Sequence, residues 1–76
     1  MTGRQTTTHS VLSTLHALAI HKVMLAPKSR VEFTFLEMDD YAVWDGYQNG
    51  INKFRITEEG ERANERFEKA GYFGTV

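Results

Sequence analysis

Apolar residues recur at spacings of three and four from Ser10 to Leu25, which is the pattern of an amphipathic helix. Proline disfavours helical geometry in the residue before it, so we expect Pro27 to end this helix. Residues 1–9 are polar, rich in threonine and without apolar periodicity, and they predict a flexible arm. The apolar stripe of the helix consists of Val11, Leu12, Leu15, Leu18, Ala19 and Val23.

The next segment, Val31 to Leu36, alternates in polarity and is rich in aromatic and β-branched residues. This composition and period predict a β-strand. Polar residues bound the segment on both sides, with Lys28 and Ser29 before it and Asp39 and Asp40 after it.

Residues 41–56 allow two interpretations. Asp39 or Asp40 could cap a short helix that Asn49-Gly50 closes, but Asn-Gly is also a strong two-residue hairpin signal. Pairing of two strands across that loop places apolar side chains on one face and the tryptophan and basic side chains on the other, so we favour the hairpin over the helix. One face then holds Val43, Tyr47, Phe54 and Ile56, and the other holds Trp44, Lys53 and Arg55.

A final helix is predicted after Thr57, whose hydroxyl can cap it, and acids in the first turn suit the helix dipole. Gly71 is a typical C-terminal stop. We expect Tyr72 and Phe73 to fold back over the core. The predicted buried stripe of this helix is Ala63, Phe67 and Ala70.

These elements predict one small α+β domain over residues 10–76, with an N-terminal helix, an antiparallel sheet of two or three strands and a C-terminal helix. The first and last helices should pack on one face of the sheet. A chain of 76 residues has no room for a second domain or a deep substrate cavity. The core is predicted to include Leu12, Leu15, Leu18, Ala63 and Phe67.

Composition narrows the function classes. Cysteine is absent, and small secreted domains usually need disulfides, so we expect a cytoplasmic protein. No apolar run is long enough to cross a membrane, and the N-terminus does not resemble a secretory leader. The spacing of His9, His16 and His21 places no two of them one turn apart on a helix, so we expect no metal site. No motif indicates catalysis, a cofactor or a small-molecule substrate, and we predict that the protein is not an enzyme.

Charge is distributed unevenly along the chain. Residues 1–31 contain four basic residues and no acid, whereas residues 32–76 contain ten acids and five basic residues, and the formal net charge is −1. Nucleic-acid-binding domains usually carry a basic excess, so any such binding must come from a local patch.

Residues 54–67 resemble the end of many winged-helix regulators, in which a wing strand closes on an aromatic-x-hydrophobic-Thr-x-x-Gly signature and leads into a helix. Here Phe54, Ile56, Thr57 and Gly60 provide that signature. The resemblance implies a winged-helix-like arrangement and a regulator that binds DNA. The segment between Pro27 and Asn49 departs from the family, which has two helices there.

Our first hypothesis is therefore a non-enzymatic, winged-helix-like regulator that binds a macromolecule, with nucleic acid as one candidate ligand. Three basic residues are candidates for phosphate contacts, and a second group on the hairpin would supply base stacking and charge. The candidates are Arg4, Lys28 and Arg30 in the first group and Trp44, Lys53 and Arg55 in the second.

The alternative is a small protein-binding inhibitor or adaptor, of the kind that phages or mobile elements encode against a host nucleic-acid-handling complex such as a defence system. An acidic band would then compete with nucleic acid for a basic groove on the partner. Homodimer formation stays open under both hypotheses. The candidate residues of the band are Glu32, Glu37, Asp39, Asp40 and Asp45.

Overall fold

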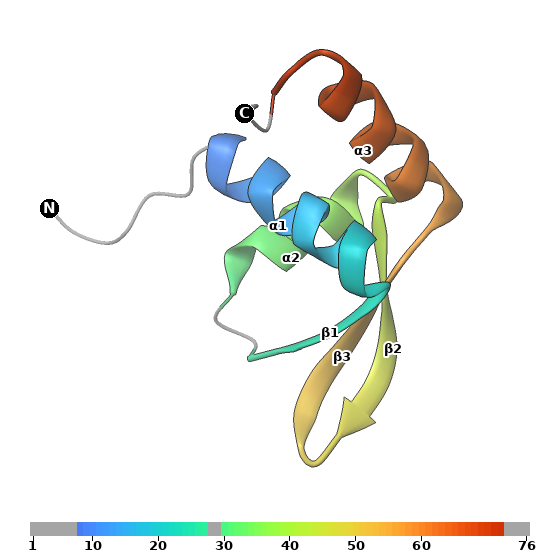
Figure 1. Ribbon diagram of the computed structural model, residues 1–76. Helices are drawn as coiled ribbons and strands as arrows, with labels where there is room; N and C mark the ends of the chain where they lie inside the picture. The colour runs from blue at the N-terminus through green and yellow to red at the C-terminus, as the bar shows by residue number, and fades with distance from the viewer. Residues whose placement is uncertain (1–7, 28–29, 73–76) are drawn as a thin grey trace, which may run out of the picture.

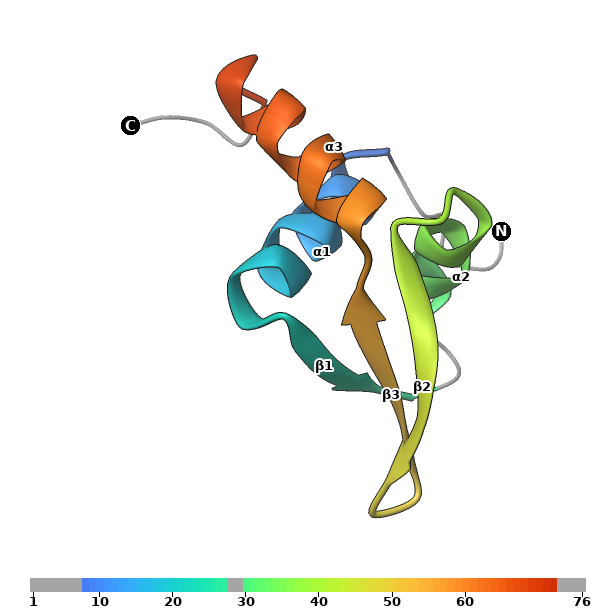
Figure 2. The same cartoon turned by 90° about the vertical axis from the view of Figure 1, so that its right-hand side faces the viewer.

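The structure is a computed structural model that describes residues 8–27 and 30–72. Three antiparallel strands form a sheet in the order β1-β3-β2. The helices gather toward one end of this sheet, and the β2–β3 hairpin projects away from them (Figures 1 and 2). The predicted α+β class is confirmed. The elements are α1 (Thr8–His21), β1 (Val23–Ala26), α2 (Val31–Met38), β2 (Ala42–Gln48), β3 (Ile51–Ile56) and α3 (Glu58–Lys69).

Helix α1 spans Thr8–His21, so it begins within the predicted arm of residues 1–9 and ends before the predicted end at Leu25. The rest of that arm, residues 1–7, lies outside the described residues. Lys22 has a left-handed φ of 72°, which turns the chain into β1, and the backbone N–H of Ile56 donates to the carbonyl of Lys22. The prediction failed because β1 pairs with β3, which is distant from it in the sequence, and such tertiary pairing outweighs local helical periodicity. Within β1 the side chains alternate, with Ala26 buried and Leu25 exposed.

The predicted strand over residues 31–36 is wrong, because the segment forms α2. A short apolar run is compatible with both helical and strand periods, and packing decides between them. As a helix it buries Phe33 and Leu36, which are three residues apart, and the Phe33 ring stacks on Phe54 with centroids 4.6 Å apart. It also leaves Phe35 exposed.

The predicted hairpin is confirmed. Asn49 and Gly50 have φ values of 54° and 79°, so both lie in the left-handed region that a type I′ turn requires. The strand register differs from the prediction by one residue, because Trp44 pairs with Phe54 and not with Arg55. The register shifts between Trp44 and Tyr47, which identifies a β-bulge in β2.

This bulge corrects the predicted sorting of the side chains. Trp44 lies on the inner face of the sheet, which the helices cover, together with its partner Phe54. Val43 pairs with Arg55 on the outer face. Trp44 and Val43 are therefore on the opposite faces from those predicted, whereas Tyr47, Phe54, Ile56, Lys53 and Arg55 are sorted as expected.

Helix α3 begins as predicted. The Thr57 hydroxyl accepts a hydrogen bond from the Gly60 N–H at 2.9 Å. A Cβ at Gly60 would lie 2.2 Å from the carbonyl oxygen of Tyr41, so only glycine allows this helix start to approach the α2–β2 connection. Ala63 is buried, but Ala70 is exposed and does not belong to the buried stripe.

The C-terminal turn also follows the prediction in part. Gly71 has a φ of 76°, which suits a helix stop. The Tyr72 ring packs edge-on against Phe67, with centroids 5.7 Å apart, and Phe73 lies outside the described residues. Together α1, α2, α3 and the inner sheet face enclose one core that consists of Leu12, Leu15, Leu18, Ala26, Phe33, Leu36, Ala42, Phe54, Ile56 and Ala63.

Candidate functional site

A cleft of about 460 Å³ lies between α2 and the inner face of the β2–β3 hairpin, and we call it the aromatic cleft. Helix α2 and the residue before it contribute one helical face, with spacings of three and four. The hairpin contributes residues from both of its strands. The lining residues are Pro27, Arg30, Phe33, Thr34, Glu37, Trp44, Tyr47, Asn52 and Phe54.

Two exposed rings form the hairpin side of the aromatic cleft. Trp44 is 47% exposed and Tyr47 is 64% exposed, and their rings meet edge-to-face with centroids 5.3 Å apart. The Trp44 indole N–H donates to the Asn52 side-chain oxygen at 3.1 Å, which fixes the orientation of the ring. The stacked and buried pair of Phe33 and Phe54 lies below them. The cleft thus combines a rigid apolar floor with accessible rings.

The β-bulge is the reason that these two rings lie together. Side chains along a regular strand alternate between faces, so residues three apart would point to opposite sides. The extra residue between Trp44 and Tyr47 restores both to the inner face. Gly46 has a φ of 92° and open space where a Cβ would lie, so glycine is needed there for its backbone conformation.

Arg30 connects the cleft wall to α1 and is not a free cation. Its Nε lies 3.2 Å from the Glu32 carboxylate, one guanidinium nitrogen donates to the Thr14 hydroxyl, and the group lies over the Phe33 ring at 5.6 Å. The Ser10 hydroxyl also donates to Glu32, at 2.6 Å. This hydrogen bond, followed by a backbone hydrogen bond and those from Arg30, lowers the pKa of Glu32.

Glu37 is the exposed carboxylate of the aromatic cleft. It lies in the last turn of α2 and has no ion pair or side-chain hydrogen bond within the residues that the structure describes. Asp39 and Asp40 follow it in an exposed turn. These three acids form a negative rim at one end of α2, whereas Glu32 is buried and does not contribute to it.

The predicted nucleic-acid residues do not form one surface. Arg4 and Lys28 lie outside the described residues. Lys53 and Arg55 lie on the outer sheet face, where their side chains are 3.9 Å and 3.8 Å from Asp45. The predicted stacking residue, Trp44, is on the opposite face of the same hairpin. The predicted acidic band is divided as well, because Asp45 faces away from Glu37.

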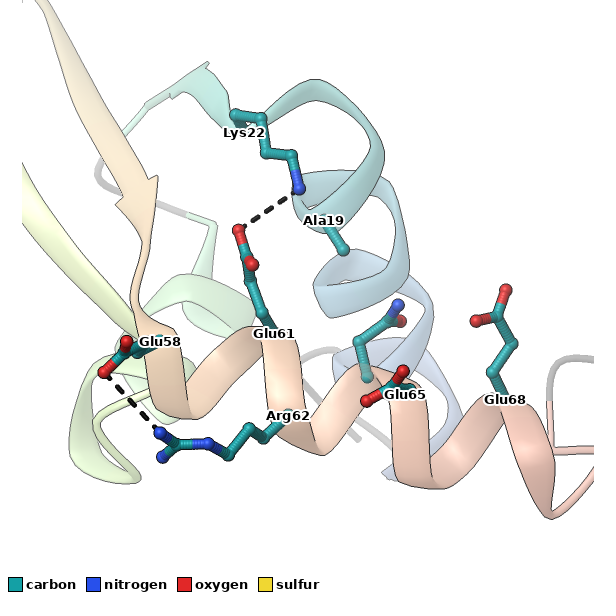
Figure 3. Close-up of a pocket in the computed structure, with 8 residues that line it drawn as sticks. Ala19, Lys22, Glu58, Glu61, Arg62, Glu65 and Glu68 are labelled. Atoms are coloured by element: carbon teal, nitrogen blue, oxygen red, sulfur yellow. Dashed lines mark hydrogen bonds and ion pairs between the residues drawn. The ribbon is translucent and has the colours of Figure 1, made fainter.

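A second hollow of about 390 Å³ lies between α1 and α3, where Figure 3 shows carboxylates arranged along α3. Lys22 pairs with Glu61 at 3.1 Å and Arg62 pairs with Glu58 at 3.6 Å. The spacing of these acids by three and four residues could have predicted an acidic helix face, but our sequence reasoning missed it. The acids are Glu58, Glu61, Glu65 and Glu68.

The described residues contain no group of three or more histidine or acidic side chains that could hold a metal ion. The Nδ1 atom of His16 lies 3.1 Å from the side-chain oxygen of Asn64 on α3. No helix in the described part of the chain has the length and apolarity to cross a bilayer.

Comparison with family models, curated proteins and solved structures finds no match to this chain.

Proposed function

We propose that this protein is a non-enzymatic regulator that binds a partner protein through the aromatic cleft. The observation that supports it best is the pair of exposed rings, Trp44 and Tyr47, above a buried apolar floor. Tryptophan and tyrosine are enriched among the residues that dominate binding energy in protein interfaces. The Trp44 indole N–H already donates to Asn52, which reduces the entropy that this ring loses when a partner docks.

The distribution of charge favours a protein partner over nucleic acid. Single-stranded nucleic acid needs stacking rings and cations along one surface. Here the rings and the cations of the hairpin lie on opposite faces, and Arg30 is already paired with Glu32. Glu37, which has no ion pair with any residue in the ranges 8–27 and 30–72, would repel phosphates.

The outward face of α2 gives a second, independent reason. The winged-helix resemblance implies two helices between the first strand and the hairpin that forms the wing. In the described part of the chain, α2 is the one helix between β1 and the β2–β3 hairpin. Roughly 100° per residue places Val31, Phe35 and Met38 on one stripe that points away from the core. These side chains are 39%, 44% and 73% exposed. An apolar stripe suits a protein surface and lacks the basic residues that contact phosphates.

The small inhibitor or adaptor that we considered as an alternative now becomes the preferred class, with a different contact surface. Such a protein needs a surface of complementary shape and no catalytic group. The aromatic cleft and the negative rim of Glu37, Asp39 and Asp40 provide that surface. A basic, nucleic-acid-handling complex is the kind of partner that this charge favours.

Capture of partners by matched variants tests this proposal. The immobilised wild-type chain, Tyr47→Ala and Ile20→Ala are compared for proteins retained from a lysate of the source cells or of their host. Ile20 is also apolar and is 63% exposed, but it lies on α1 outside the cleft. We expect a protein that the wild type and Ile20→Ala retain and that Tyr47→Ala loses. Equal retention by all three would remove the cleft from the proposal.

Titration with nucleic acid is a second test of the proposed function. Trp44 is the only tryptophan of the chain, so its fluorescence reports directly on the cleft. We expect no saturable change with duplex or single-stranded oligonucleotides at either low or moderate salt. Saturable binding that Tyr47→Ala abolishes would overturn the protein-binding proposal in favour of a nucleic-acid ligand.

A further inference from the structure

We infer that the aromatic cleft receives an arginine side chain of the partner protein, held between the exposed rings of Trp44 and Tyr47 and the carboxylate of Glu37. This inference rests on the proposed function and specifies the chemistry that the partner must present. It follows from three features of the cleft, which are its rings, its exposed acid and the engagement of Arg30 with other residues of the chain.

The rings provide the apolar part of the arginine site. A guanidinium group is planar and weakly hydrated, so it stacks on aromatic faces, and tryptophan is the strongest of these acceptors. Trp44 and Tyr47 meet at 79°, so their faces point in different directions and form two walls at a corner. The hydrogen bond from Trp44 to Asn52 holds one wall in place.

Glu37 provides the charged part. It lines the same cleft, is exposed, and has no ion pair among the described side chains. A carboxylate accepts two parallel N–H donors from a guanidinium group, which adds direction to the attraction. Asp39 and Asp40 extend the negative potential beyond the cleft and would increase the rate at which a basic segment arrives.

The protein's own arginine leaves this site open. Arg30 belongs to the same helical wall of the cleft as Glu37, but its guanidinium group is held by Glu32 and Thr14 and lies over Phe33. Its contacts therefore point toward α1 and the floor. Among the residues that the structure describes, no cation is recorded on the exposed Trp44 and Tyr47 rings or beside Glu37.

The chemistry predicts an order of preference among side chains. Lysine has the same charge as arginine, but its ammonium group is compact and strongly hydrated and cannot form the planar stack or the paired hydrogen bonds. Citrulline keeps the planar shape and loses the charge. We therefore expect arginine to bind best, lysine less well and citrulline least.

Three seven-residue peptides test this order. Each is acetylated, amidated and built of glycine around one central residue, which is arginine, lysine or citrulline. Trp44 fluorescence follows each titration of the full chain at low salt, since the chain has no other tryptophan. We expect saturable binding of the arginine peptide, with the lysine peptide about threefold weaker and the citrulline peptide about tenfold weaker.

Two variants and one matched control connect the binding to the cleft. Glu37→Gln should reduce the advantage of arginine over citrulline to about twofold or less, because the charge attraction is lost. Tyr47→Ala should weaken binding of all three peptides. Glu68→Gln removes an equal charge from an exposed position in the hollow between α1 and α3 and should leave the affinities for all three peptides unchanged. Circular dichroism of each variant checks that the chain is folded.

The inference is overturned if arginine and citrulline peptides bind equally, or if Glu37→Gln and Glu68→Gln behave alike. Equal affinities for arginine and lysine would reduce the site to a nonspecific acidic surface and also overturn it. These failures differ from failure of the proposed function, which is decided by whether Tyr47→Ala loses a captured protein partner.

Discussion

The two faces of the β2–β3 hairpin differ in what their side chains do. On the inner face, Phe54 and Ile56 are buried in the core, and Trp44 and Tyr47 continue that apolar surface into the aromatic cleft. On the outer face, Val43 and Ile51 are about 40% exposed and stand beside charged side chains that pair only loosely. On a single side, one pair of strands therefore carries both the support of the fold and the proposed binding surface.

This difference shows why the strand register matters more than composition. A shift of one residue moves a side chain to the other face of a sheet. Without the bulge, Trp44 and Tyr47 would be divided between the two faces. The difference between the faces thus depends on one extra residue in β2.

The largest contrast is expected from truncation of one side chain on each face. Phe54→Ala removes a ring that is 7% exposed and stacked on Phe33, and should lower the free energy of unfolding by about 3–5 kcal/mol. Val43→Ala on the outer face should cost less than about 1 kcal/mol. Thermal and urea melts measure both. A similar loss for the two variants would contradict the assignment of the faces.

The second-largest expected effect is on the pH dependence of the free energy of unfolding, through Glu32. The pKa of Glu32 is lowered in the folded state, so its ionised form stabilises the fold above the unfolded pKa, and this contribution is lost as pH falls through the folded pKa. Glu32→Gln should cost about 1–3 kcal/mol at neutral pH and flatten the acid limb of the stability profile. Glu65→Gln, at an exposed position, should leave the acid limb unchanged. An unchanged limb in Glu32→Gln would contradict this role.

Replacement of Gly46 tests whether the β-bulge places the Trp44 and Tyr47 rings on the inner face. Gly46→Ala places a Cβ on a residue with a φ of 92° and should cost about 1–2 kcal/mol. Gly50→Ala, at φ 79° in the loop, should cost a similar amount. Only Gly46→Ala should change the emission of Trp44 and weaken binding in the cleft. If both variants affected Trp44 equally, the bulge would not be what positions the rings.

The smallest effect is expected from the ion pairs of the outer face. Asp45→Asn removes two contacts, at 3.8 Å and 3.9 Å, between exposed groups. Such pairs are worth about 0–1 kcal/mol and are screened by salt. The loss of stability should therefore disappear in about 1 M salt, and peptide binding in the cleft should be unaffected. A larger loss that persists at high salt would mean that the outer face also supports the fold.

The sequence predicted the elements that local chemistry determines. The Asn49-Gly50 loop and the Thr57 cap each depend on residues within a few positions of one another, and each is confirmed. The core leucines of α1 are also confirmed, because a long amphipathic period is hard to mistake.

The errors have tertiary causes. The β1 strand exists through its pairing with β3, and α2 is helical because Phe33 and Leu36 must reach the same core. In the candidate site, Trp44 was singled out from the sequence as a stacking ring on the outer hairpin face, but its face and its neighbours depend on the bulge. Gly46 was the available signal, since a glycine within a strand often marks a bulge.

The hairpin tip also bears on how this protein can change over generations. Residues 45–51, from the bulge through the loop, contribute no side chain to the core, and they lie beyond the helices in both views (Figures 1 and 2). Substitutions there cost the fold little as long as Gly46 and the Asn49-Gly50 loop are kept. Tyr47 lies within this permissive stretch, so selection can alter what the cleft recognises without passing through unstable intermediates.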